Sequence, residues 1–413
     1  MNSILALFLA GGLLVSTLTG CTAQIIEKSV VEEPAIVEPV IDPVVQEPIV
    51  DGGLFNISNE KGYKSVENLF NIVKKEGENN MISPLSLQLA LGMAVTGADG
   101  ETRAEIERFM NCDTGTLTNK SFELFQMIDE LGEESETKLS IANSMWIDKG
   151  MRATYISSFE DILRNDFKAD IKEVVLSESE NEINKWADEK TKGMIPKIVE
   201  DITPETKSIL LNAVYFAGIW DDPFEKDFTK KEKFTLSNGN KIEVDMMNGF
   251  GDRYFENEEA FAVEKYYEDG FSFIAIASKK DIENVDVKDL LLNSEVDCQQ
   301  INLKLPKFKF DSDYKLSGAL KKLGINKAFD SESADFSNMS TVPYFISDVF
   351  QKTAIEMDEE GTKAAAVTGI MLETCSIDMR PIIDVVLDKP FMFMIIDDNG
   401  NIYFYGNIEN PNK

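Results

Sequence analysis

The sequence predicts an α+β fold with one large core, and three segments carry this prediction. An apolar run after Ser83-Pro84 is typical of a buried helix, because Ser is a favoured N-cap and Pro suits the first helical position. Leu210–Trp220 is apolar apart from Asn212, as in a buried central strand, and Asn302–Phe310 alternates as a half-buried strand does. Asn212 would be buried in its strand, so it needs hydrogen-bond partners.

The chain divides into three parts along its length. Residues 1–20 form an apolar leader, residues 21–55 are rich in Val, Pro and Glu, and residues 56–413 contain no Pro/Gly/Ser-rich break, repeat or low-complexity tract. Proline fixes φ and the acidic residues repel one another, so we expect residues 21–55 to form an extended, disordered linker. Residues 56–413 are expected to fold as one domain.

The leader ends in Leu18-Thr19-Gly20-Cys21, which resembles a bacterial lipobox. This resemblance implies cleavage before Cys21, lipid modification of its thiol, and anchoring of a secreted domain to a bacterial membrane. No Lys or Arg precedes the apolar run, which departs from an ordinary secretory n-region. An ordinary secretion signal or an uncleaved anchor remains an alternative, and the sequence does not say which bacterial membrane would hold the lipid.

The composition argues against several classes of function. The chain has no histidine, which removes Ser-His-Asp and Cys-His catalysis and the commonest zinc ligand. Its net charge is −32, from 73 acidic and 41 basic residues, so it lacks the basic footprint of a nucleic-acid binder. We therefore expect no enzymatic activity, no nucleic-acid partner, and neither a metal nor another cofactor.

The cysteines do not suggest a disulfide framework. There are only four in a chain of 413 residues, at Cys21, Cys112, Cys298 and Cys375. We expect Cys112 and Cys298 to be unpaired structural thiols.

The segment Ile355–Ser376 has an unusual pattern. A strand-like opening passes through acidic residues and Gly361 into an alanine-rich stretch. Read with a period of two, the face that begins at Thr362 carries no charge, whereas Lys363 and Glu373 lie on the other face. Alanine has a low β-propensity, so the segment fits a loop that lies outside a sheet and can be inserted into one.

This pattern resembles the hinge and reactive-centre loop of inhibitory serpins, a family of serine protease inhibitors. The residues that match the hinge are Glu359, Glu360, Gly361, Thr362, Ala364, Ala365 and Ala366. The resemblance covers residues 56–413. Its matching segments are Met81–Leu87 with Ala90–Met93, Asn184–Ile195, Leu210–Trp220 with Pro223-Phe224, Asn302–Phe310, Leu320–Phe329 with Ala334–Ser337, and Asp388–Phe393 with Tyr405–Pro411. It implies the serpin fold, with three β-sheets, about nine helices, an exposed reactive-centre loop and a metastable native state.

The resemblance also implies a mechanism in which the protein is consumed. A target protease cleaves the loop and becomes acylated, and the freed hinge inserts into the central sheet and drags the protease with it. Thr362 would enter first, and a charge at that position would be buried at a cost of several kcal/mol. Thr362 carries no charge, which favours an inhibitor. The alternative is a non-inhibitory serpin-fold binding or scaffold lipoprotein.

The family's spacing from Gly361 places the scissile bond at Cys375-Ser376. Cysteine is small and moderately apolar, so an elastase-like or subtilisin-like serine protease is the expected partner, and a papain-like cysteine protease is an alternative. Counting back from Pro390 leaves Met379-Arg380 as the rival bond. We expect a monomer. We also expect no basic site for a polyanion, because residues 101–136, where some serpins bind one, are net acidic.

Four residues match the family's shutter, the region that holds the central sheet closed: Ser83, Ser86, Asn212 and Gln351. The position of Gln351 usually carries a histidine that hydrogen-bonds to the residue equivalent to Asn212. Since a Gln amide can both donate and accept, we expect the shutter to be rewired rather than broken.

Overall fold

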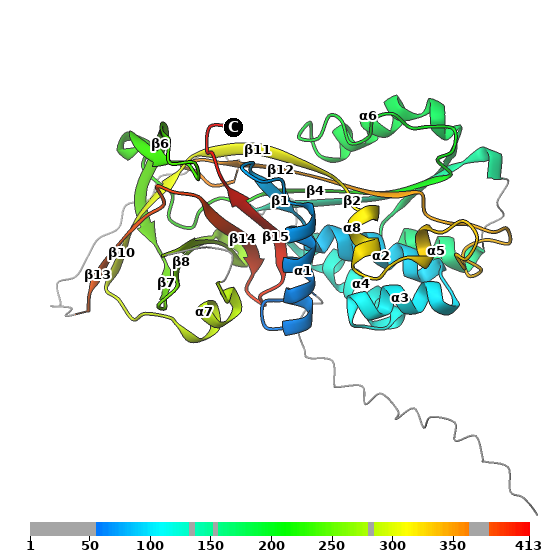
Figure 1. Ribbon diagram of the computed structural model, residues 1–413, viewed down its shortest axis with the longest axis horizontal. Helices are drawn as coiled ribbons and strands as arrows, with labels where there is room; N and C mark the ends of the chain where they lie inside the picture. Colours follow the sequence, from blue (N-terminus) through cyan, green and yellow to red (C-terminus); the bar gives the residue numbers. More distant parts are fainter. Residues whose placement is uncertain (1–54, 132–136, 152–155, 280–284, 363–379) are drawn as a thin grey trace, which may run out of the picture. The chain divides into compact units, whose positions relative to one another are not determined.

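The computed structural model describes residues 55–131, 137–151, 156–279, 285–362 and 380–413 (Figure 1). These residues belong to one compact unit, Ile49–Lys413, and contain three β-sheets and eight α-helices. The predicted α+β class and the three sheets are therefore confirmed, and eight helices stand against the expected nine or so. The helices are α1 (Glu60–Val73), α2 (Pro84–Gly97), α3 (Gly100–Met110), α4 (Thr114–Leu131), α5 (Ser157–Asn165), α6 (Glu180–Lys190), α7 (Val287–Asn293) and α8 (Ser317–Lys322).

Sheet A has five strands in the order β11-β12-β4-β2-β3. Its strands are β11 (Phe308–Lys315), β12 (Asp348–Met357), β4 (Ser208–Ala217), β2 (Lys138–Asp148) and β3 (Asp170–Val174). β12 runs parallel to β4, whereas β11 and β2 run antiparallel to their partners β12 and β4. The two central strands of the sheet therefore point the same way.

The other two sheets pack at one end of the unit (Figure 1). Sheet B has six strands, β1 (Asn80–Ile82), β15 (Ile402–Ile408), β14 (Phe391–Asp397), β9 (Phe271–Ser278), β8 (Ala260–Tyr267) and β7 (Arg253–Glu256). Sheet C has four, β13 (Ile382–Val386), β10 (Gln300–Pro306), β6 (Lys241–Gly251) and β5 (Lys230–Thr235). β14 pairs antiparallel with β15, the last strand of the chain.

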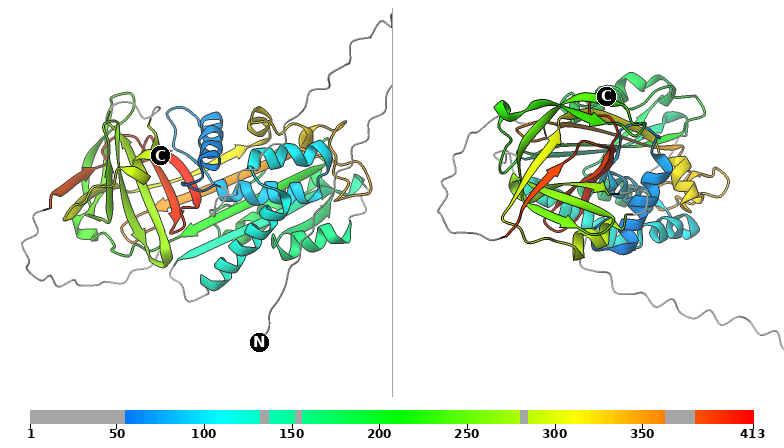
Figure 2. Two further views of the ribbon diagram at one scale, coloured as in Figure 1. Left: turned by 90° about the horizontal axis from the view of Figure 1, so that it is seen from below. Right: turned by 60° about the vertical axis from the view of Figure 1, so that its left-hand side comes forward.

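Both faces of sheet A are covered, which explains why β4 is apolar throughout. Leu210 packs in the core cluster that contains the α2 side chains, whereas its neighbours Ile209 and Leu211 pack in the cluster of α6. Figure 1 shows α6 on one side of the sheet and α2 to α5 on the other, and Figure 2 shows the second group lying across the strands. A strand buried on both faces has no polar side to alternate with.

The predicted buried helix is α2, and it begins where the sequence indicates. The Ser83 hydroxyl accepts a hydrogen bond from the Ser86 N–H at 3.2 Å, and Pro84 is the first helical residue. All of its residues except Thr96 are buried. The helix packs against β4 and β12 of sheet A, so its first turn lies where these two strands meet.

One sequence prediction is wrong, because Asn302–Phe310 is not a single strand. The segment is divided between β10 of sheet C and β11 of sheet A. The break lies at Pro306, which has no N–H, and at Lys307, whose N–H donates to the Asp245 carbonyl at 2.8 Å. The alternation survives on each side of the break, which is why a single strand was predicted.

Two further expectations concern thiols and membrane spans. Cys112 and Cys298 are both free, as predicted, and burial raises the pKa of the Cys112 thiol to about 12. Among the helices of the described residues, none is both long and apolar enough to cross a membrane. Cys21 and Cys375 lie outside the described residues.

Candidate functional site

The candidate site lies where sheet A changes from closed to open. β12 pairs with β4 from Asp348 opposite Ile209 to Thr353 opposite Val214. Both strands continue beyond this point, β12 to Met357 and β4 to Ala217, and there each is paired only with its outer neighbour, β11 or β2. The C-terminal ends of β12 and β4 are therefore separated within an otherwise continuous sheet.

Thr362 stands in this separation. After β12 the chain turns at Asp358–Gly361, and Thr362 then lies antiparallel to Met357 while Gly361 lies antiparallel to Ile219. The Thr362 N–H donates to the Gly218 carbonyl at 2.7 Å. Thr362 thus occupies the first position of an additional strand that would be antiparallel to both β12 and β4.

The side chain of Thr362 points into the protein. It is 2% exposed, and its hydroxyl lies 2.7 Å from the hydroxyl of Tyr267. Burial raises the pKa of Tyr267, so this residue remains a neutral hydrogen-bonding phenol. Since alternate residues of a strand share a face, a strand that continued from Thr362 would direct the uncharged face inward.

An aromatic layer holds the turn that precedes Thr362. Trp220 stacks on Tyr267, with ring centroids 4.2 Å apart and an interplanar angle of 7°. The Trp220 N–H donates to the Glu360 carbonyl at 3.0 Å, and its indole N–H donates to the Asp358 carbonyl at 3.1 Å. The Phe224 N–H adds a bond of 2.9 Å to the Glu359 carbonyl. The hinge is thus docked mainly through its backbone.

Gly361 is required by the way the hinge is docked. Its φ is +147°, a region that L-residues rarely adopt, and a Cβ atom there would lie 2.1 Å from the Gly218 carbonyl oxygen. The obstacle is backbone rather than a flexible side chain. A larger residue would therefore move Thr362 out of position.

Charged groups fix the outer side of the hinge. Glu359 is buried, and it receives hydrogen bonds from Lys307 at 2.6 Å and from the Thr229 hydroxyl at 2.7 Å. Burial raises the pKa of Glu359, but these hydrogen bonds outweigh it and hold the pKa below its usual value. Glu360 pairs with Lys226 nearer the surface.

Lys265 lies beneath the aromatic layer and was missed by the sequence reasoning. It is 1% exposed, its Nζ donates to the Phe250 carbonyl at 2.8 Å, and it lies over the rings of Trp220 and Phe224 at 5.6 and 4.9 Å. Burial lowers its pKa. The available signal was the adjacent pair of charges, Glu264 and Lys265, within the otherwise uncharged strand-like run over Ala260–Tyr267.

The shutter residues come together at the closed part of sheet A. The Gln351 amide accepts from the Ser83 N–H at 2.9 Å and donates to the Ser83 carbonyl at 2.8 Å. The Asn212 amide donates instead to Asn143, and no side-chain hydrogen bond between described residues joins Gln351 to Asn212, although the two residues lie opposite each other in the ladder. Ser86 Oγ and Asn212 Oδ1 have no described partner. Gln351 therefore binds the helix cap, and the shutter role of these residues stays a prediction.

The predicted reactive bond falls in the part of the loop that is not described. Ala364, Ala365, Ala366, Cys375, Ser376 and Met379 all lie outside the described residues. The chain is described again from Arg380, which pairs with Asp297 at 2.7 Å, and the Pro381 carbonyl accepts from the Gln299 N–H at 2.9 Å. The two ends of the loop are thus fixed at sheets A and C.

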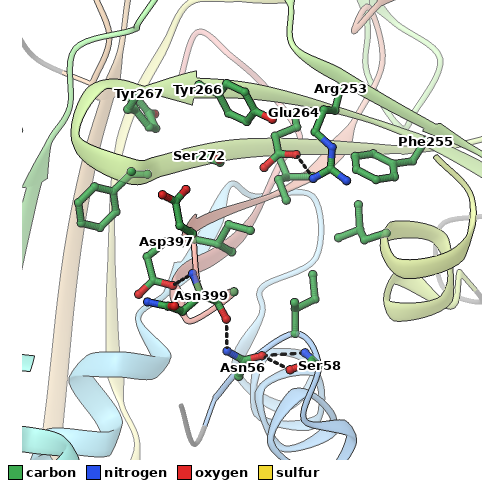
Figure 3. Close-up of a pocket in the computed structure, with 18 of the residues that line it drawn as sticks. Asn56, Ser58, Arg253, Phe255, Glu264, Tyr266, Tyr267, Ser272, Asp397 and Asn399 are labelled. Carbon is green, nitrogen blue, oxygen red and sulfur yellow. Dashed lines mark hydrogen bonds and ion pairs between the residues drawn. The ribbon is translucent and has the colours of Figure 1, made fainter. Parts of the chain in front are cut away.

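A cavity of about 690 Å³ lies beside the β8–β9 turn and is lined by several acidic residues (Figure 3). Arg253 pairs there with Glu264 at 3.1 Å, and Asp397 accepts from the N–H groups of Asn399 and Asn401. No group of three potential metal ligands is found among the described residues. The first pair joins the neighbouring strands β7 and β8, and the second set closes the turn between β14 and β15, so both are structural arrangements.

Comparisons with known proteins agree on one family. The family model described as "Serpin (serine protease inhibitor)" matches residues 66–411. Serpin-Z10 of Arabidopsis thaliana is 31% identical over 387 residues, covering 85% of this chain and 99% of the relative. An uncharacterized serpin-like protein of Thermococcus kodakarensis is 33% identical over 360 residues, covering 81% and 82%. The native crystal structure of the thermophilic serpin tengpin is 33% identical, with a TM-score of 0.75 and coverage of 86% and 92%.

Proposed function

Because the chain belongs to the serpin family, whose members are generally protease inhibitors rather than enzymes, we propose that it inhibits a serine endopeptidase as a suicide substrate. The protease attacks the loop and forms an acyl-enzyme, and insertion of the cleaved loop into sheet A then traps it before hydrolysis. The observation that carries this proposal is the pair of antiparallel bridges at the open end of the sheet, between Thr362 and Met357 of β12 and between Gly361 and Ile219, just after β4.

The register at Thr362 supports the insertion step. An antiparallel strand that continues from Thr362 opposite Met357 would bring Ala364 opposite Ile355 and Ala366 opposite Thr353. Small uncharged side chains on the inward face keep the cost of burial low. Further insertion must separate the six residue pairs that join β12 to β4, so the shutter governs how far the loop can enter.

The proposed partner is an elastase-like or subtilisin-like protease that cleaves Cys375-Ser376. The small side chain of Cys375 would fill its specificity pocket. Cleavage at Met379-Arg380, or inhibition of a papain-like cysteine protease, are the other outcomes that the experiment below distinguishes.

We also propose that the domain is displayed on a bacterial surface through lipid on Cys21, with residues 21–55 as a spacer. The four residues Leu18–Cys21 at the end of the leader support this. Incorporation of radiolabelled palmitate into the full-length chain, and its loss in Cys21→Ser, would establish the anchor. Palmitate incorporation that is equal in both chains would contradict it.

The function is tested by incubating residues 56–413 with elastase, subtilisin, chymotrypsin, trypsin and papain. We expect a complex with elastase or subtilisin that resists heat and detergent on denaturing gels, together with a released peptide that begins at Ser376 by intact mass. The cleaved protein should also gain thermal stability, because insertion adds a central strand to sheet A.

Cleavage without a covalent complex and without a gain in thermal stability would reject inhibition. It would favour a non-inhibitory serpin-fold scaffold. A complex with papain alone would move the target to cysteine proteases, and a peptide that begins at Arg380 would move the reactive bond.

A further inference from the structure

We propose that a surface on sheet C, formed around Phe228 and Phe250, is a second contact for the target protease outside the reactive loop. This inference rests on the proposed function and names where the body of the protease binds. We call it the two-phenylalanine surface.

Phe228 and Phe250 are unusually exposed for aromatic residues. Their relative exposures are 51% and 49%, and together they line a hollow of about 290 Å³ on the outer side of β6 and β10. The floor of the hollow includes the buried Leu303. Paired aromatic side chains beside a concave apolar floor are typical of the centre of a protein interface.

Hydrogen bonds and close packing fix the backbone at Phe228 and Phe250. The Phe250 carbonyl accepts from the buried Lys265 Nζ at 2.8 Å, and the Phe228 carbonyl accepts from the Asn248 side-chain amide at 2.8 Å. Gly249 packs closely on Phe224, since a Cβ atom there would lie 2.7 Å from its ring. A surface that is already ordered loses less entropy when a partner binds.

The surface adjoins both fixed ends of the reactive loop. The segment that leads to Phe228 binds the hinge through the Phe224 N–H and the Glu359 carbonyl. On the other side, β10 pairs with β13, the strand that begins just after Arg380 (Figure 1). A protease that has engaged the loop between these two ends is therefore held beside the hollow.

The charges around the hollow specify the kind of partner surface. Asp222 and Glu225 line it, and neither takes part in an ion pair between described residues. Lys304 also lines it, but its charge is matched by Glu232 at 2.7 Å. The surface thus presents an apolar centre with an acidic rim, which fits a protease surface loop with an apolar side chain flanked by Lys or Arg.

The test compares Phe228→Ala/Phe250→Ala with Phe122→Ala, using a protease that the wild-type domain inhibits. Phe122 is a matched control, because it is 43% exposed but lies on α4, outside this surface. We expect the second-order rate constant for complex formation to fall about tenfold in the double variant and to stay within twofold in the control. The stoichiometry of inhibition should not change, because the loop and hinge are intact.

A second variant, Asp222→Asn/Glu225→Gln, tests the acidic rim. We expect a lower rate and a weaker dependence of the rate on salt. Normal inhibition by the double phenylalanine variant would overturn this inference and leave the proposed function standing. A wild-type dimer that these two substitutions dissociate would also overturn it, since the surface would then bind a second copy. Failure of the wild type to inhibit any protease would reject the proposed function itself.

Discussion

The two halves of β12 differ in what they pair with. Its first half, Asp348–Thr353, is joined to β4 by a continuous parallel ladder, and Gln351 additionally holds the cap of α2. Its second half leaves β4, and the residue found at that open end is Thr362 from beyond the turn. One strand thus contains a closed segment and an open segment in direct succession.

This difference predicts where the proposed loop insertion meets resistance. At the open half, one residue of the additional strand already has its backbone and side-chain hydrogen bonds. At the closed half, insertion must replace an existing ladder before it gains a new one. The native structure therefore favours entry at one end and opposes it at the other, and four predictions test this comparison.

The largest effect is expected from Thr362→Arg at the open half. An arginine there would place an unpaired charge beside Tyr267, at a cost of several kcal/mol. The loop should still be cleaved, but the stoichiometry of inhibition should rise by about tenfold or more. Lys363→Glu is the control, since the alternation directs this position outward and inhibition should be nearly normal. Equal losses in both variants would contradict an ordered inward face.

Gly361→Ala should weaken the docking of the hinge by about 3 kcal/mol, because a Cβ atom would collide with the Gly218 carbonyl. Thermal unfolding followed by circular dichroism measures the loss. Gly193→Ala separates collision from backbone strain, since Gly193 has a φ of +83° but nothing within 4 Å of a Cβ. We expect it to lose only about 1 kcal/mol. Similar losses at the two glycines would show that the positive φ alone, and not a collision of the Cβ atom, makes glycine necessary at position 361.

Gln351→Leu should make the closed half of β12 easier to separate from β4. It leaves the N–H and carbonyl of Ser83 without their buried partners and should cost about 2 kcal/mol. We expect a lower unfolding temperature and more loop–sheet polymers on native gels after mild heating. Gln351→His, which introduces the family's usual residue, should restore part of the stability. Unchanged polymerisation in Gln351→Leu would remove Gln351 from the shutter.

The smallest effect is expected at Glu359, on the rim of the open half. Glu359→Gln should cost about 1 kcal/mol at pH 7, because Lys307 is 36% exposed and solvent screens the pair. The lowered pKa of Glu359 means that this contribution is present above its unfolded pKa and is lost as the pH falls through its folded pKa. The stabilities of the two proteins should therefore begin to converge as the pH falls below the ordinary Glu pKa of about 4.3, and they should meet below the lowered pKa of folded Glu359. Burial raises the pKa of Asp358, but that effect is common to both proteins and cancels.

Much of the fold could be predicted because local patterns and tertiary packing agree. Ser83-Pro84 begins α2, and the apolar run at Leu210–Trp220 becomes β4 with both faces covered. The prediction of a single strand over Asn302–Phe310 was wrong for a physical reason, because Phe308–Phe310 alternates equally well as part of a second sheet. Periodicity reports which side of a strand is buried, but it does not report which sheet buries it.

The site was harder to predict than the fold. The sequence singled out Gly361 and Thr362, but not that Thr362 already lies between two strands. Lys307 binds Glu359 of the hinge, and Lys265 lies over the rings of Trp220 and Phe224, which hold the hinge; their positions in the sequence give no sign of this. The resemblance paired position 351 with Asn212, whereas the amide of Gln351 binds Ser83. Side-chain partners depend on reach and donor geometry, which residue spacing does not contain.

The hydrogen bonds between Gln351 and Ser83 also bear on acid tolerance. A carboxamide has no proton to gain between pH 5 and 8, and neither Ser83, Asn143 nor Asn212 titrates in that range. A histidine at position 351 would instead become charged within it. The contact between Gln351 and Ser83 is therefore expected to hold sheet A equally well in mildly acidic and neutral surroundings, whereas a histidine there would make the opening of the sheet depend on pH.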